Sequence, residues 1–381
     1  MHKTPSFLLP HGGCMTTTPE RHPLSLSDIE DILAYIPHAL GFHPVNSVVL
    51  LLIRERRLEA TLRVDLPALH PEPELDSWVA QVTNLLGRMP EVKSVIAVVY
   101  ASGSHGAETS IPYQRMYHRL STQLPRRGVA LQHAWCVGTD SIWDYEEDSF
   151  EQHRPRPEIS GNENHLTMVF AGSAPMEKPW DGCGIPPWAN AQVIRELVRD
   201  LGLNALEGIE CWARLLDLPA EVAEAEIHQY PLRAAELISS LHWKVVRDVL
   251  PFLAGTSHEE TVAVLTALSA REAGEEVPEL AHFLLGRGLR SPDWQRTERL
   301  WRLARDLLGI AQGQQRFALM CVLGWIEWAK GRGSLAMTLL EQVLRECPDY
   351  NLALLLKEML SRGLMPHWVT DQLRAWRAHF G

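Results

Sequence analysis

The segment 37–47 combines chemically capable side chains with residues that restrict the backbone. Two prolines and Gly41 hold this segment, Phe42 and His43 lie between the prolines, and Ser47 begins an apolar run. Imidazole titrates near neutral pH, so His43 could act as an acid or a base, and a rigid loop at a strand end often binds a ligand in α/β proteins. The alternative is structural: Gly41 would adopt a positive φ, Phe42 would fill the core and Ser47 would cap a backbone group.

Arg63 and Asp65 are a second candidate pair, on the strand predicted over residues 58–66. Side chains two residues apart lie on the same face of a strand, so the two charges should be neighbours. Arginine can bind a carboxylate or phosphate through two parallel hydrogen bonds, so this pair could bind an anionic ligand. The alternative is an internal ion pair between the two side chains.

A third candidate is the Gly-rich loop 102–106, which contains Ser104 and His105 and precedes a helix predicted to begin near Ser110. Backbone N–H groups at the start of a helix can bind a phosphate or carboxylate. The loop is neither a GxxxxGK[ST] nor a GxGxxG sequence, and no GxSxG motif is present. A simple connecting loop is the alternative, and catalysis by this pair would need a third group from elsewhere in the fold.

Metal-binding patterns are incomplete in this sequence. The acidic residues Asp144, Glu146, Glu147, Asp148 and Glu151 lack the spacing of an EF-hand, and no HExxH motif accompanies them. His133 and Cys136 form an HxxC pair without a second pair. We therefore predict no metal site, and no motif indicates a cofactor.

The elements needed to position these residues can be read from hydrophobic periodicity. Residues 25–175 predict an α/β domain with a mixed, mainly parallel sheet and flanking helices, because strands and amphipathic helices alternate along most of it. The predicted helices cover residues 28–36, 78–89 and 111–124, and the predicted strands cover residues 47–53, 58–66, 92–100, 129–137 and 165–172.

The remainder of the chain predicts a second domain made only of helices. A Pro-, Gly- and Trp-rich connection over 176–188 leads into residues 189–381, where apolar positions recur at three- and four-residue steps. The stretch 317–350 is similar to one tetratricopeptide hairpin, whereas a peptide-binding solenoid needs about three such repeats. Residues 1–24 predict a flexible tail, in which Met15 is an alternative start.

The composition of the chain argues against a nucleic-acid-binding, membrane-spanning or secreted protein. The chain has 36 basic and 47 acidic side chains, and its net charge of −11 would repel a nucleic-acid backbone, so no nucleic-acid partner is expected. No apolar run reaches the ~18 to 20 residues of a membrane helix, and no secretory signal is recognisable. The six cysteines form no CxxC pair, which favours reduced thiols in a cytoplasmic protein.

One block of sequence carries a family resemblance. It consists of Ile36-Pro37-His38-Ala39-Leu40-Gly41-Phe42-His43-Pro44-Val45-Asn46-Ser47, followed by a hairpin whose second strand ends in Arg63-Val64-Asp65-Leu66-Pro67. With the C-terminal segment ECPDYNLALLL, this block resembles the actinobacterial DUF4192 family over nearly the whole chain. The cysteine cluster associated with that family is reduced here to Cys136, so the resemblance implies an architecture and no chemistry.

Two hypotheses for function follow. The first is a non-catalytic binding or scaffold protein that recognises a protein partner, or itself, through the helical half, because no catalytic motif is complete. The alternative is an enzyme or sensor that binds a small anionic metabolite at the strand ends of the α/β domain. Its candidate residues are Gly41, Phe42, His43, Ser47, Arg63, Asp65, Ser104 and His105. Convergence of these residues in one pocket would favour the alternative.

Overall fold

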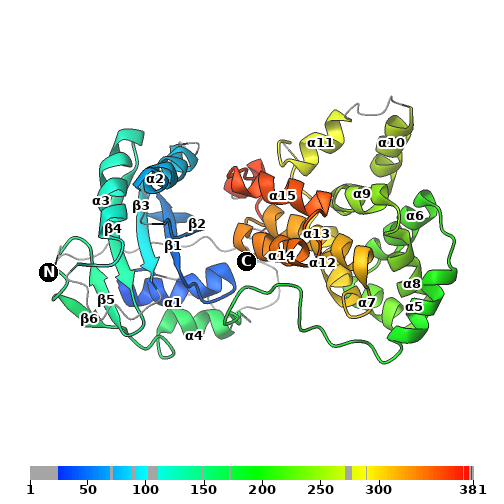
Figure 1. The fold of residues 1–381 in the computed structure, drawn as a ribbon, viewed down its shortest axis with the longest axis horizontal. Helices are drawn as coiled ribbons and strands as arrows, with labels where there is room; N and C mark the ends of the chain where they lie inside the picture. Colours follow the sequence, from blue (N-terminus) through cyan, green and yellow to red (C-terminus); the bar gives the residue numbers. More distant parts are fainter. Residues whose placement is uncertain are drawn as a thin grey trace, which may run out of the picture. The chain divides into compact units, whose positions relative to one another are not determined.

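In the computed structural model the chain forms two compact units, and the division falls in the sequence between Pro179 and Trp180. Figure 1 shows the helices and strands of each unit. The first is an α/β unit and the second a helical unit, as the sequence predicts. The structure describes residues 25–68, 72–87, 89, 91–101, 110–147, 149–170, 173–270, 277–288, 290–371, 373–376 and 379. The predicted tail and the candidates Ser104 and His105 lie outside these residues.

Six strands form the sheet of the α/β unit, in the order β2-β1-β3-β4-β5-β6. Their bounds are β1 Ser47–Arg54, β2 Arg57–Asp65, β3 Ser94–Tyr100, β4 Ala130–Val137, β5 Ser141–Asp144 and β6 His153–Pro155. Of the paired strands described, only β3 and β4 are parallel, so the prediction of a mainly parallel sheet is wrong. The β1–β2 hairpin reverses the chain, and the next connection returns it to the far side of β1, which makes β1 antiparallel to both of its neighbours.

Helices cover both faces of this sheet, because β1 and β3 are apolar and buried almost throughout. The crossover helices α2 (Glu72–Gly87) and α3 (Gln114–Gln123) lie side by side, joined by ion pairs from Arg119 to Glu72 and Asp76, and the short 3₁₀ helix η1 (Pro125–Arg127) follows α3. The helix α1 (Ile29–Leu40) covers the other face and lies beside α4 (Glu163–Phe170) in Figure 1.

Helix α1 continues past its predicted end at Pro37. Pro37 cannot donate a backbone hydrogen bond to the preceding turn, but its carbonyl can still accept one. The last turn forms because the Gly41 N–H donates to the Pro37 carbonyl over 2.7 Å. The helix ends at Gly41, whose φ of 82° lies in the left-handed region that glycine adopts without strain. The predicted positive φ at Gly41 is therefore present.

The strand predicted over residues 165–172 is wrong, because the described part of this segment belongs to helix α4. The side chain of Asn162 accepts hydrogen bonds from the N–H groups of Asn164 (2.9 Å) and His165 (3.3 Å), which satisfies donors at the start of the helix. Asn164 and Met168 are buried four residues apart, whereas Phe170 is exposed. A short apolar run with this one-sided burial fits a helix as well as a strand.

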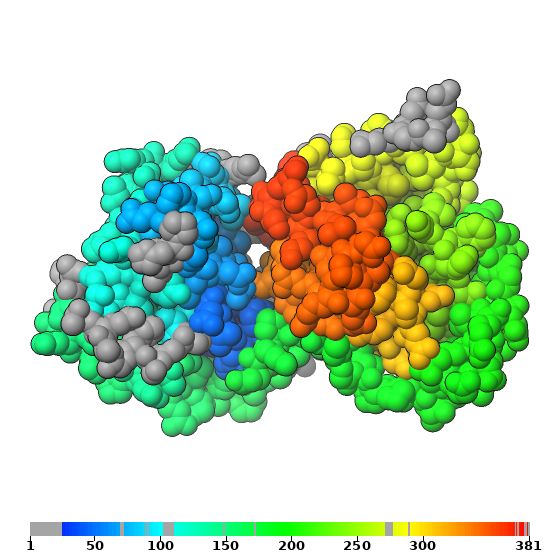
Figure 2. Space-filling model, in the orientation of Figure 1, coloured from blue at the N-terminus to red at the C-terminus, as the bar shows by residue number. Residues whose placement is uncertain are grey.

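Only helices are described in the second unit. Their bounds are α5 Ala191–Asp200, α6 Ala205–Leu216, α7 Ala220–Gln229, α8 Pro231–Ser240, α9 Lys244–Gly255, α10 His258–Ser269, α11 Pro278–Leu284, α12 Trp294–Leu307, α13 Gly313–Ala329, α14 Gly333–Glu346, α15 Asn351–Ser361 and the 3₁₀ helix η2 His367–Thr370. A continuous apolar core includes the fully buried rings of Trp212 and Trp368. Helices α14 and α15, coloured orange to red, lie side by side on the face seen in Figure 2.

Helices α13 and α14 form a hairpin over the stretch in which the sequence predicts a tetratricopeptide-like pair. The turn contains Gly331, with a φ of 81°, and Gly324 allows a close approach, because a Cβ there would lie 3.3 Å from the side chain of Leu340. Glu327 in α13 is buried and faces Lys330 at 3.8 Å and Arg332 at 3.6 Å. The hairpin is present, and its relation to tetratricopeptide repeats stays a prediction.

Candidate functional site

A row of polar side chains lies at one end of the sheet, where β1 begins and β2 and β3 end. Ser47 is directly opposite Asp65 on β2 and Tyr100 on β3, so the three side chains share one face. Ser47 is 0% and Tyr100 5% exposed, and neither hydroxyl forms a hydrogen bond with any described residue. A buried polar group without a partner costs about 1–3 kcal/mol, so these two hydroxyls mark a place where a polar ligand would be stabilised.

The Tyr100 side chain lines a pocket of about 30 Å³ between the sheet end, α1 and the loop after β6. That volume can hold one or two water-sized groups. Its lining consists of Leu33, Pro37, His43, Pro44, Tyr100, Arg156, Pro157 and Ile159. The polar groups among these are an imidazole, a phenol and a guanidinium, all of which can donate hydrogen bonds, and no carboxylate lines the pocket.

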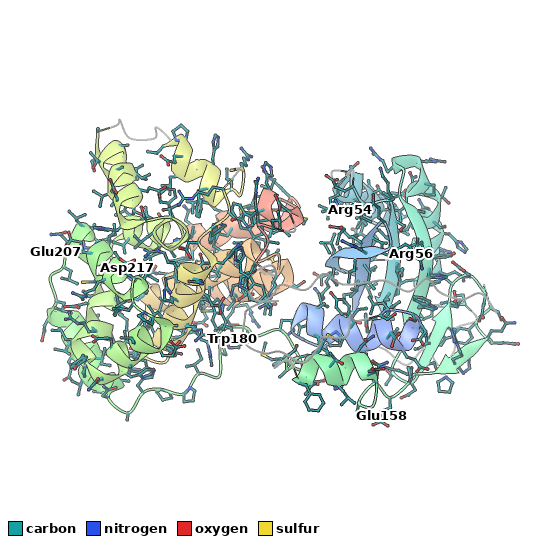
Figure 3. All side chains as sticks on the ribbon, turned by 180° about the vertical axis from the view of Figure 1, so that it is seen from behind. Arg54, Arg56, Glu158, Trp180, Glu207 and Asp217 are labelled. Atoms are coloured by element: carbon teal, nitrogen blue, oxygen red, sulfur yellow. The ribbon has the colours of Figure 1, made fainter. Side chains whose placement is uncertain are left out.

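Arg156 supplies the positive charge of the pocket. Glu158, labelled in Figure 3, marks the loop between β6 and α4 that carries it. The backbone N–H of Arg156 donates to the carbonyl of Asp140 over 2.8 Å, and its side-chain Nη1 donates to the carbonyl of Gly138 over 3.3 Å. These two bonds fix the guanidinium beyond the end of β4, and a guanidinium has further donors for a ligand.

Burial determines the protonation state of Tyr100. It raises the pKa of the phenol well above its usual value of 10, and the nearby charge of Arg156 opposes this only in part. The phenol therefore keeps its proton at neutral pH and can donate it in a hydrogen bond.

The loop that carries His43 is held by the segment after α4. Phe42 and Met176 form a parallel bridge, in which the His43 N–H donates to Met176 O and the Met176 N–H donates to Gly41 O, each over 2.9 Å. The ring of Phe42 is 1% exposed and fills the core beneath this loop. Rigid backbone on both sides of His43 therefore keeps its imidazole against the pocket.

The predicted site residues are only partly brought together. His43 lines the pocket, Gly41 and Phe42 support it, and Ser47 lies beside Tyr100 in the sheet. Arg63 and Asp65 are on the same face but do not line the pocket: the Arg63 Nη2 lies 2.7 Å from the Asp65 Oδ1. This is the internal ion pair that the sequence left as an alternative.

The sequence of the chain matches the model of one known protein family. The sequence model of a domain of unknown function, DUF4192, matches residues 30–173 and 195–367. The chain belongs to the DUF4192 family. The resemblance seen in the sequence is confirmed, and the first matched range of this DUF4192 protein contains His43, Tyr100 and Arg156. Comparison with curated proteins and with solved structures returns no match.

The sequence alone missed two groups of this DUF4192 site, Tyr100 and Arg156. Tyr100 is a polar-tipped aromatic at the end of an apolar strand, a weak signal that could have been noticed. Arg156 lies in an exposed, Pro-flanked segment without periodicity, and no local pattern distinguishes it from other surface arginines.

The described residues of the DUF4192 chain contain no cluster of three or more His, Cys, Asp or Glu side chains that could hold a metal ion. None of their helices has both the length and the apolar character needed to span a bilayer.

Proposed function

We propose that the α/β unit binds a small anionic metabolite by one acid group, held among Arg156, His43 and the Tyr100 hydroxyl. The observation that carries this proposal is the buried, unpartnered Tyr100 hydroxyl beside a guanidinium in one pocket. Hydrogen bonds between charged groups are roughly twice as strong as neutral ones, and the polar lining consists of donors. An anion would satisfy all three groups together.

The size of the pocket limits the ligand class. A volume of about 30 Å³ accepts a carboxylate or one face of a phosphate, whereas pockets that enclose a whole drug-sized molecule measure roughly 300–1,000 Å³. The rest of the ligand would extend out of the pocket. The pocket therefore selects the ligand by its acid group, which can be a carboxylate or a phosphate. Separate titrations with acetate and with inorganic phosphate distinguish these two groups.

Thermal unfolding in the presence of inorganic phosphate or acetate tests the proposal. A ligand that binds only the folded state raises Tm with concentration, so we expect phosphate, acetate or both to stabilise the wild-type protein at constant ionic strength. We expect Arg156→Gln to abolish this shift. Arg154→Gln is the matched control, since Arg154 is an exposed arginine on β6 that does not line the pocket. An equal shift in Arg156→Gln and wild type would contradict the proposal.

A second proposal concerns the helical unit, which would recognise a protein partner or a second copy beside its tetratricopeptide-like hairpin. Its support is the apolar surface of α15, where Leu354 and Leu355 are 44% and 60% exposed. Sedimentation of the wild type and of Leu355→Glu tests self-association. We expect a concentration-dependent dimer that Leu355→Glu weakens. A monomer at all concentrations would exclude the second copy.

A further inference from the structure

A second polar cluster lies where α1 meets α4 and the segment after it. His38 is in the last turn of α1, His165 is in the first turn of α4, and Ser173 follows α4. The His38 Nδ1 is 2.8 Å from the Ser173 Oγ, and the His38 Nε2 is 2.9 Å from the His165 Nδ1. All three residues are partly buried, so the chain of hydrogen bonds is only partly open to water.

This order of groups is the arrangement that activates a serine. When His38 carries its proton on Nε2, it donates to His165, and its Nδ1 lone pair accepts the hydrogen bond of the Ser173 hydroxyl. In a catalytic triad the nucleophile is hydrogen-bonded to a base, and a third group orients that base. A triad is recognised by this geometry and not by the positions of its residues in the sequence.

The same loop supports this cluster and the anion pocket. Pro37, which precedes His38, lines the pocket, and so does His43. Met176, three residues after Ser173, is paired with the backbone on both sides of Phe42. A molecule whose acid group lies against Arg156 would thus be held by the structural elements that also present Ser173.

We propose that Ser173 is a nucleophile for acyl transfer from a carboxylic ester, with His38 as its general base and His165 as a positioning residue. We expect this ester to carry an acid group as well, and that part of the proposal rests on the proposed anion site. The assignment of the nucleophile rests on the hydrogen-bond chain alone. The DUF4192 protein would in this case be an esterase.

The reaction balances without a cofactor. The Ser173 Oγ attacks the ester carbonyl carbon while its proton passes to the His38 Nδ1. The bond to the leaving alcohol breaks, and His38 returns the proton to that alcohol. Water then attacks the acyl-serine, gives its proton through His38 to the Ser173 Oγ, and releases the acid. Ester and water become acid and alcohol.

The surroundings of His38 give this reaction a distinctive pH profile. Burial, and then the nearby charges of His165 on α4 and His43 on the loop, lower the pKa of His38 from 6.5 to about 4. His38 is therefore neutral and able to accept a proton throughout the range above about pH 5. We expect reactivity to fall only near pH 4, whereas an unperturbed histidine would lose it near pH 6.5.

A fluorophosphonate probe tests the nucleophile directly on the full chain. The Ser173 Oγ would form a P–O bond as the P–F bond breaks, fluoride leaves and His38 takes the proton. We expect peptide mass spectrometry to find the adduct on Ser173 and to find none in Ser173→Ala. Ser160→Ala is the matched control, because the Ser160 hydroxyl donates to the carboxylate of the exposed Glu158 and not to a histidine. Folded wild-type protein without an adduct on Ser173 would overturn the proposal.

Rates of labelling separate the roles of the two histidines. Loss of a general base costs roughly 10²- to 10⁴-fold in rate, so we expect at least a 100-fold decrease in His38→Ala. We expect about a 10-fold decrease in His165→Ala and partial recovery in His165→Asn, whose amide oxygen can accept from His38. Circular dichroism verifies that each variant is folded. Labelling at the wild-type rate in folded His38→Ala would refute the triad.

The two proposals fail separately. The fluorophosphonate is a neutral ester, so Arg156→Gln should still be labelled at Ser173 while it loses the phosphate or acetate shift in Tm. Loss of that shift in Ser173→Ala would contradict the separate assignment of the two sites. Retention of the shift without any labelling of wild type would leave the anion site intact and reject the nucleophile.

Discussion

At the scale of single residues, the candidate site differs from the rest of the core in its hydrogen bonding. Tyr145, another buried tyrosine, donates to the Pro112 carbonyl over 2.5 Å. Tyr100 has no such bond with a described residue. Two tyrosines of similar burial thus have different environments, and Tyr100 lines the pocket described above.

Replacing Tyr100 by phenylalanine separates stability from binding. We expect Tyr100→Phe to leave the free energy of unfolding unchanged or to raise it by up to about 1 kcal/mol, because an unpaired buried hydroxyl is removed. Tyr145→Phe, the control, should lower it by about 1 kcal/mol, because a hydrogen bond is lost. Urea unfolding measures both, and the Tm shift with anions should weaken in Tyr100→Phe alone. Equal destabilisation of both variants would contradict this assignment.

His38 links stability to pH in a defined direction. Its pKa is about 4 in the folded protein and near 6.5 when unfolded, so between these values only the unfolded chain binds the proton. Stability is therefore unaffected above about pH 6.5 and decreases as the pH falls from 6.5 through 4. We expect the loss between pH 7.5 and 5 to be smaller in His38→Asn than in wild type, as measured by urea unfolding. The same loss in both proteins would exclude His38 as its source.

At the scale of elements, local patterns predicted most helices and strands, but not how the strands pair. The hairpin over 47–66 and the buried strand β3 follow from their apolar patterns, and β1, β2 and β3 lie where predicted. Their directions depend on which side of β1 the chain returns to, which no periodicity encodes. The strands β5 and β6 are short and polar at their ends, so they were missed.

Close packing of helices provides a test at the same scale. Gly208 in α6 lies against α8, and a Cβ at this position would be 2.5 Å from the Cβ of Ser240. We expect Gly208→Ala to lower the free energy of unfolding by about 1–3 kcal/mol, because helices in a packed core cannot separate without loss of contacts. Gly333→Ala, where nothing lies within 4 Å, should be neutral or slightly stabilising. Thermal or urea unfolding compares them, and an unchanged Gly208→Ala would refute the close approach.

At the scale of the whole molecule, each unit has its own apolar core. The core of the α/β unit includes Phe42 and Val98, and that of the helical unit includes Trp212 and Trp368. The division between Pro179 and Trp180 falls in the stretch 176–188 that the sequence predicts as a connection. Segments with separate cores can fold independently.

Expression of the separate units tests this organisation. We expect residues 180–381 alone to show helical circular dichroism and a cooperative thermal transition, because the whole cluster around Trp212 lies within this range. Residues 25–179 should give a mixed spectrum with a transition of their own. A fragment 180–381 that is unfolded, while the full chain is folded, would contradict independent folding.

The sequence by itself determined the division into an α/β and a helical part, the apolar strands, the rigid loop 37–47 and the family. These features depend on composition and on neighbours within a few positions, which a sequence shows directly. Tertiary structure alone decided the direction of the strands and the meeting of His43, Tyr100 and Arg156. It likewise decided the contact of His38 with Ser173. Such contacts join segments that are distant along the chain, and packing of the whole unit, not local periodicity, brings them together.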